Sequence, residues 1–221
     1  MQRNNVSVEG DNNIAISRLG FTAANWRLFF GNSPRIYNGS IELPITRRFH
    51  FMDVKPEILY LDGERWIPSK TYFEFNVPVI ASSTKVVYIF QSATDALSYF
   101  QIKAMADKDA TFFVLGKNPS EAIIRYIKAW FNHARFILCY PNGLMGRISE
   151  IKTAGFLSNE HVRLELDNQR LICSYRNRKA IIPLDVVSLS QVSKLTGFYP
   201  KKIKTHKPKK GYDSFYDLIR S

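Results

Sequence analysis

The sequence predicts an α/β fold with an open, mostly parallel sheet and flanking helices, preceded by a small antiparallel β module. Three short apolar runs are typical of strands buried on both faces, and a helical pattern follows each of them. These runs lie at 86–90, 111–115 and 135–139. Strands that alternate with helices favour a parallel sheet, whose ligands bind outside the carboxyl ends of the strands. The first candidates for a site are therefore Gln91, Gly116 and residues 140–146.

The chain divides into three regions. Residues 1–84 contain two hairpin signals, Asn38-Gly39 and Asp62-Gly63, among β-forming residues, and these predict the antiparallel module. Residues 85–166 form the α/β core. Residues 167–221 contain a predicted hairpin, a helix, a basic segment and a short last helix.

Several elements inside these regions are predicted by local signals. The late hairpin spans 170–175 and 179–183, and the helix after it runs from about Asp185 to Leu195. In the core, residues 118–121 read Asn-Pro-Ser-Glu, a capping signal that puts Pro119 at the first position of a helix. One face of that helix is apolar and is assigned to the core: Ile123, Ile127, Trp130 and Phe131.

Composition is that of an ordinary soluble globular chain. Of 221 residues, 45% are hydrophobic, and no run of about 18 apolar residues suggests a membrane span. The first residues lack the apolar stretch of a signal peptide, so the expected location is cytoplasmic. Two cysteines and four scattered histidines show neither a disulfide framework nor zinc-ligand spacing, and Cys139 is interpreted as a buried strand residue.

The positive charge is concentrated in one part of the chain. Residues 168–210 contain eleven Lys or Arg and one acid, a net charge of +10 out of a total of +12. Six of the lysines fall within 201–210, which we call the basic strap and expect to be extended. Such a segment attracts phosphates through counterion release, and the alternative is a solvated tail. The candidate nucleic-acid contacts are Arg147, Arg170, Arg176, Arg178, Lys179, Lys201, Lys202, Lys204, Lys207, Lys209 and Lys210.

Three segments of the core resemble one known family. Residues 88–98 read as a strand, a strand-end polar residue and then a small residue before Asp-Ala-Leu, and Leu115-Gly116 ends the next strand. Residues 137–154 read as a third strand, a loop, Gly-Arg and a helix. This order resembles the Toprim domain of bacterial primases, topoisomerases and related nucleases, in the form found in primase and mobilization proteins of mobile elements. The resemblance covers roughly 85–156, with a short echo of the mobilization proteins at 211–218.

The resemblance implies a site whose acids are missing. Gln91 stands where the family has a Glu, and Tyr140-Pro141-Asn142 stands where it has an Asp-Asn-Asp motif. Alignment from Gly146-Arg147 instead gives Pro141-Asn142-Gly143, again without a carboxylate. Toprim-type sites use these carboxylates to hold Mg²⁺ and the Glu to transfer a proton. The implied outcome is no catalytic residue, no metal and no cofactor.

The remaining polar candidates each have a structural alternative. Asp95 and Glu150 are the fallback acids of an active Mg²⁺ enzyme, but Ser92 and Asp95 also have capping-box spacing, and Glu150 is expected on a solvated helix face. Arg147, near a helix start, is a candidate phosphate contact. The aromatic residues 49–51 and Trp66 are either base-stacking platforms or core.

Three functions stay open. The preferred one is a degenerate, non-catalytic Toprim-like pseudo-enzyme that binds the DNA or RNA backbone, or assembles with other proteins, in replication or mobile-element machinery. The second is an active Mg²⁺-dependent primase, topoisomerase or nuclease. The third is a structural protein of a large nucleoprotein particle. None of them involves a membrane.

Overall fold

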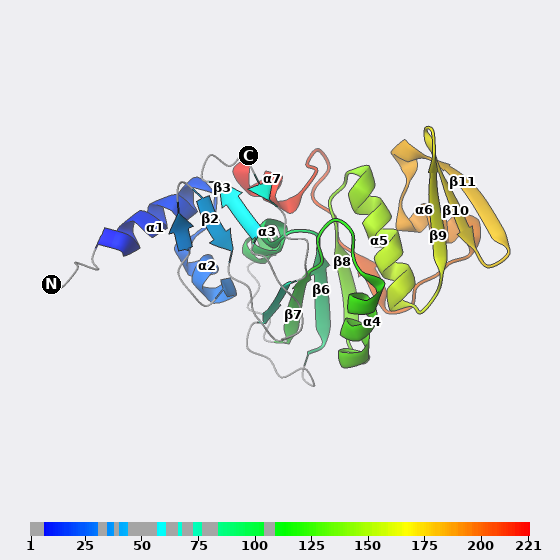
Figure 1. Ribbon diagram of the computed structural model, residues 1–221, viewed down its shortest axis with the longest axis horizontal. Helices are drawn as coiled ribbons and strands as arrows, with labels where there is room; N and C mark the ends of the chain where they lie inside the picture. The colour runs from blue at the N-terminus through cyan, green and yellow to red at the C-terminus, as the bar shows by residue number, and fades with distance from the viewer. Residues whose placement is uncertain are drawn as a thin grey trace.

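The computed structural model describes residues 7–30, 35–37, 40–43, 57–60, 66–67, 73–76, 84–103 and 109–221. Its described strands form three sheets, of five, four and three strands, with helices packed around the largest (Figure 1). The four parallel strands flanked by helices confirm the predicted α/β class.

The central sheet has the strand order β12-β8-β6-β7-β5. Four strands are parallel and β5, at one edge, is antiparallel. The strands are β5 (Phe73–Asn76), β6 (Val86–Phe90), β7 (Ala110–Val114), β8 (Arg135–Cys139) and β12 (Ile203–Thr205). Phe90 of β6 is in register with Val114 of β7 and Cys139 of β8, so these strands end at one level.

Helices cover both faces of this sheet because alternate strand residues point to opposite sides. Tyr88 and Phe90 pack with α3, while Val87 and Ile89 pack toward α4 and α5. On the first face lie α1 (Ser7–Arg18), α2 (Ala23–Phe30), α3 (Ala93–Lys103) and α7 (Phe215–Arg220). On the second lie α4 (Glu121–Trp130) and α5 (Leu144–Leu157).

The amino-terminal region contains an antiparallel sheet, as the hairpin signals predict. Its strands are β1 (Arg35–Tyr37), β2 (Ser40–Leu43), β3 (Glu57–Tyr60) and β4 (Trp66–Ile67). The two signals themselves, Asn38-Gly39 and Asp62-Gly63, lie outside the described residues. The region also contributes two unpredicted helices, α1 and α2, and its strand β5 belongs to the central sheet.

The third sheet lies beyond α5, at the far end of the molecule from α1 (Figure 1). Its strands β9 (Val162–Asp167), β10 (Arg170–Tyr175) and β11 (Arg178–Pro183) are antiparallel, which confirms the predicted late hairpin and adds one strand to it. The helix expected from Asp185 begins later. A 3₁₀ turn, η2 (Leu184–Val186), comes first, and α6 (Leu189–Thr196) follows. The N-cap of α6 is Ser188, whose side chain accepts the backbone N–H of Gln191.

Two predictions for α4 are wrong. The helix begins at Glu121, so Pro119 is not its first residue; Ser120 before it is extended and makes no side-chain cap bond. Trp130 is 56% exposed, because the stripe that faces the sheet consists of Ile124, Ile127 and Phe131. Trp130 falls beside this stripe and packs on Tyr126 instead.

The middle of the basic strap forms an edge strand of the central sheet. Ile203–Thr205 forms β12, the edge strand that pairs parallel with β8. Across the described residues, no helix is both long and apolar enough to cross a membrane.

Candidate functional site

The carboxyl ends of β6 and β8 form a topological switch point, and we call this position the crevice because open α/β sheets usually bind ligands there. The chain leaves β6 for α3 on one face of the sheet and leaves β8 for α5 on the opposite face. Adjacent strands whose connections diverge in this way mark the usual ligand site of an open α/β sheet. Gln91 follows β6 and residues 140–142 follow β8, so the structure brings these predicted site positions to the crevice.

The chain's own carboxy-terminal segment lies across this crevice. Asn142 donates its backbone N–H to the carbonyl oxygen of Asp213 and its side-chain N–H to that of Tyr212, both at 2.7 Å. These bonds hold the loop after β8 against the segment that leads into α7. Asn142 therefore has a structural role in joining the two.

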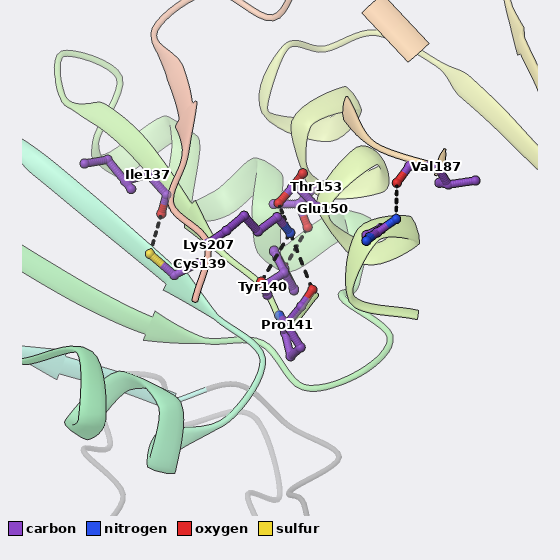
Figure 2. A network of polar contacts seen from close by, with 9 residues as sticks. Ile137, Cys139, Tyr140, Pro141, Glu150, Thr153, Val187 and Lys207 are labelled. Carbon is purple, nitrogen blue, oxygen red and sulfur yellow. Dashed lines mark hydrogen bonds and ion pairs between the residues drawn. The ribbon is translucent and has the colours of Figure 1, made fainter. Parts of the chain in front are cut away.

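An ion pair between the half-buried Lys207 and the buried Glu150 lies beside the loop that follows β8 (Figure 2). The Lys207 ammonium lies 2.6 Å from a carboxylate oxygen of Glu150 and donates to the carbonyl oxygens of Tyr140, at 3.2 Å, and Pro141, at 3.4 Å. Carboxylate and carbonyl oxygens are the ligands that hard divalent cations take in proteins. Here these oxygens surround an ammonium that belongs to the chain itself.

Glu150 is not on a solvated face, so that expectation is wrong. Its side chain is 2% exposed and is paired with Lys207 of the strap. Burial raises the pKa of Glu150, and the Lys207 charge and hydrogen bond, with the charge of Arg147, oppose that rise. As a fallback acid Glu150 is thus enclosed and paired.

Asp95, the other fallback acid, caps a helix. Ser92 accepts the backbone N–H of Asp95 at 3.1 Å, which is one of the two bonds of the expected capping box. The Asp95 carboxylate accepts the Ser92 hydroxyl, at 3.0 Å, in place of the backbone N–H that a capping box uses. The other carboxylate oxygen accepts the backbone N–H of Tyr216 at 3.0 Å, in the first turn of α7. Burial raises the pKa of Asp95 to about 6, against the bonds from Tyr216, Ser92 and Phe215.

Three further residues at the crevice are buried. Tyr140 is fully buried, with its hydroxyl 2.8 Å from that of Thr153, and Gln91 is 8% exposed. Cys139 is a buried strand residue, as predicted, and burial raises the pKa of its thiol well above the usual value. A Cβ on Gly146 would lie 2.5 Å from the carbonyl oxygen of Pro141, so this glycine permits α5 to approach its own loop.

Arg147 points away from the crevice. Its guanidinium donates to the carbonyl oxygens of Asp185, at 2.8 Å, and Val187, at 3.1 Å. This contact joins the start of α5 to η2 and the segment before α6. The structure therefore gives Arg147 a role in attaching the three-stranded sheet to the core.

Most of the other basic candidates are exposed, and they fall into separate places. Arg176, Arg178 and Lys179 lie at the turn of the β10–β11 hairpin, whereas Arg170 lies at its opposite end, in register with Pro183. Lys201, Lys202 and Lys204 run along the exposed edge of the central sheet at β12. The exposed candidates are Arg170, Arg176, Arg178, Lys179, Lys201, Lys202, Lys204, Lys209 and Lys210.

The aromatic candidates and a possible metal site remain to be placed. Residues 49–51 lie outside the described part of the chain, and the side chain of Trp66 is not described. Within the described ranges, no three His, Cys, Asp or Glu side chains gather into a possible metal site.

Sequence reasoning missed the Lys207–Glu150 pair. In the sequence, only the neighbouring Pro208 distinguishes Lys207 from the other strap lysines. In the structure Pro208 is buried, and the five other strap lysines are exposed.

No protein-family model, curated protein or solved structure matches this chain. The fold therefore defines a class and no more: a mixed α/β protein with four parallel strands flanked by helices and a separate three-stranded antiparallel sheet.

Proposed function

We propose that this protein is a non-catalytic, Toprim-like component of replication or mobile-element machinery that binds a nucleic-acid backbone. The observation that carries the proposal is that the two remaining carboxylates at the crevice are paired and buried. Both are satisfied from within the chain, Glu150 by the Lys207 ammonium and Asp95 by the first turn of α7. A general base or metal ligand needs an accessible carboxylate, and neither of these is accessible.

Nucleic acid as the partner rests on the charge and its exposure. Residues 168–210 carry a net charge of +10. Nine of the Lys and Arg residues in this range that the sequence predicts as nucleic-acid contacts are exposed. Phosphate contacts from such cations provide affinity without reading sequence. Lys207 is not counted among these phosphate contacts, because its ammonium pairs with Glu150.

A salt titration tests this function. We expect a fluorescence-anisotropy titration with duplex DNA to give a log K that falls steeply with log salt. Replacing the five exposed strap lysines by Gln should reduce the magnitude of the slope by up to about 4.5, because each phosphate that is no longer neutralised removes about 0.9 from it. The strap residues changed are Lys201, Lys202, Lys204, Lys209 and Lys210.

The matched control removes the same charge elsewhere on the exposed surface and should keep most of the slope. Its residues, also changed to Gln, are Arg18, Arg27, Lys103, Lys117 and Arg135. Equal slopes for the wild type and the strap variant would remove the strap from the interface and the main reason for naming nucleic acid.

A metal assay separates this proposal from an active enzyme. With Mg²⁺ or Mn²⁺ we expect no nicking, relaxation or priming of DNA and no tight metal binding by calorimetry. Metal-dependent turnover that disappears in Asp95→Asn would refute the pseudo-enzyme, since this change keeps the size and the acceptor oxygen of the side chain.

A further inference from the structure

Two adjoining hollows lie at the opposite end of the sheet from the crevice. One, of about 460 Å³, is formed by the ends of α4 and α5 and the starts of β8 and β12. The other, of about 480 Å³, lies between the hairpin turn at 176–178 and the end of α6. Tyr175 and Tyr199 line both, and we call the two hollows together the amino-end groove.

An exposed aromatic ring stands in this groove. Tyr199 is 71% exposed, although the residue before it, Phe198, is 1% exposed and packs on Tyr175 with ring centroids 5.2 Å apart. Gly197, with φ of 76°, ends α6 in the left-handed conformation and turns the chain toward this anchor. Tyr199 is therefore exposed to solvent, while the residue next to it in the chain is fixed in the core.

Cations line the same groove as the ring. The groove is lined by five of them and by one acid, Glu160, which already pairs with Arg176 at 2.8 Å. The five are Lys128, Arg176, Arg178, Lys201 and Lys202. Burial lowers the pKa of Lys128, and the charges of Arg125 and Lys202 lower it further, as expected where positive charge accumulates.

Two of these cations sit in a strained backbone. Arg176 has φ of 52° and Lys202 has φ of 60°, in the left-handed region that side chains rarely adopt. The other two non-glycine residues with positive φ in the described ranges, Asn159 and Asn168, are of the type that tolerates it. Arg176 lies in the two-residue turn of the β10–β11 hairpin, where positive φ is common. Lys202 is not in a hairpin turn, and conformations of this kind cluster at binding sites.

We propose that the amino-end groove binds a single-stranded nucleic acid, DNA or RNA, with one base stacked on Tyr199 and phosphates contacted by Arg178, Lys201 and Lys202. This inference rests on the proposed function and adds the form of the nucleic acid and the place where it binds. A ring beside cations is the arrangement that binds single strands, since an unpaired base offers its face for stacking. In a duplex that face is covered by the neighbouring base pairs.

The test is binding of labelled oligonucleotides of about twelve nucleotides, single-stranded and duplex, at matched salt. Wild type should prefer the single strand. Tyr199→Ala should lower single-strand affinity by at least about fivefold and leave duplex affinity unchanged, while Tyr199→Phe should bind as wild type, because stacking needs the ring and not the hydroxyl. Circular dichroism should show all three proteins equally folded, since this side chain is exposed.

A charge-matched pair of variants locates the site. Lys201→Gln with Lys202→Asn, which suits the left-handed backbone, should weaken single-strand binding more than Lys209→Gln with Lys210→Gln, although both remove the same charge. Equal losses in the two double variants, or unchanged binding in Tyr199→Ala, would overturn the groove and leave the proposed function standing. Absence of binding to either oligonucleotide at low salt would overturn both.

Discussion

The ion pair of Lys207 with Glu150 provides the sharpest test of how the crevice is closed. Lys207→Met removes the ammonium and keeps an unbranched side chain of similar length. It leaves a carboxylate that is 2% exposed, and two carbonyl oxygens, without their cation. We expect the variant to fold and to be clearly less stable than wild type.

The structure sets the size of this loss. Removing one partner of a fully buried pair costs about 3–5 kcal/mol, because the other charge stays buried and uncompensated. The Lys207 side chain is 29% exposed, so water compensates part of that loss. We therefore expect the free energy of unfolding to fall by about 2–3 kcal/mol at neutral pH.

Urea unfolding at several pH values measures this loss. Without the ammonium the pKa of Glu150 should rise further, so the folded variant binds a proton more tightly than the unfolded chain does. Stability then falls as pH rises from the unfolded pKa to the folded one, and the defect of Lys207→Met should shrink toward acid pH. Adding Glu150→Gln should restore most of the stability, and the double-mutant cycle yields the coupling.

Lys209→Met is the matched control. It removes an exposed strap lysine two residues away and should change the stability by less than about 0.5 kcal/mol. A loss for Lys207→Met that equals this control, or one that Glu150→Gln does not restore, would show that the pair is not buried and that the crevice is open.

Three further changes test the residues around this pair. Because the pKa of Asp95 is raised to about 6, the folded state favours its proton, and the free energy of unfolding should fall by about 3 kcal/mol between pH about 4 and 7; urea titrations of Asp95→Asn should lack this fall. Gly146→Ala places a Cβ 2.5 Å from a backbone carbonyl oxygen and should cost about 1–3 kcal/mol in thermal unfolding, whereas Gly143→Ala meets nothing within 4 Å and should cost a few tenths. Tyr140→Phe leaves the buried hydroxyl of Thr153 without its partner and should cost about 1–2 kcal/mol in urea, and an unchanged midpoint would contradict that bond.

The elements that the sequence predicted are those with a local signal. The strands at 86–90 and 135–139 are buried on both faces, so a continuous apolar run marks them. The β10–β11 hairpin alternates and was found for a similar reason. In contrast, β12 is only three residues long and its last two are exposed, so it forms a strand through its pairing with β8.

The candidate site was predicted in part. Its location at the carboxyl ends of β6 and β8, and the neutral residues there, follow from the order of strands and from their last residues. The groove around Tyr199 was not predicted, because its residues come from α4, α5, the hairpin and the strap. Nothing in the local pattern at 198–202 indicates those neighbours.

The sequence alone determined which strands are buried, where positive charge is concentrated and which strand ends lack acids, because each of these depends on residues close together in the chain. Tertiary structure alone decided the state of the remaining acids. Asp95 meets α7 across 121 residues, and Glu150 meets Lys207 only because β12 joins the sheet beside β8. The same spacing of charges would leave both carboxylates in water if the carboxy-terminal segment packed elsewhere, since burial and pairing depend on distance in space and not on distance along the chain.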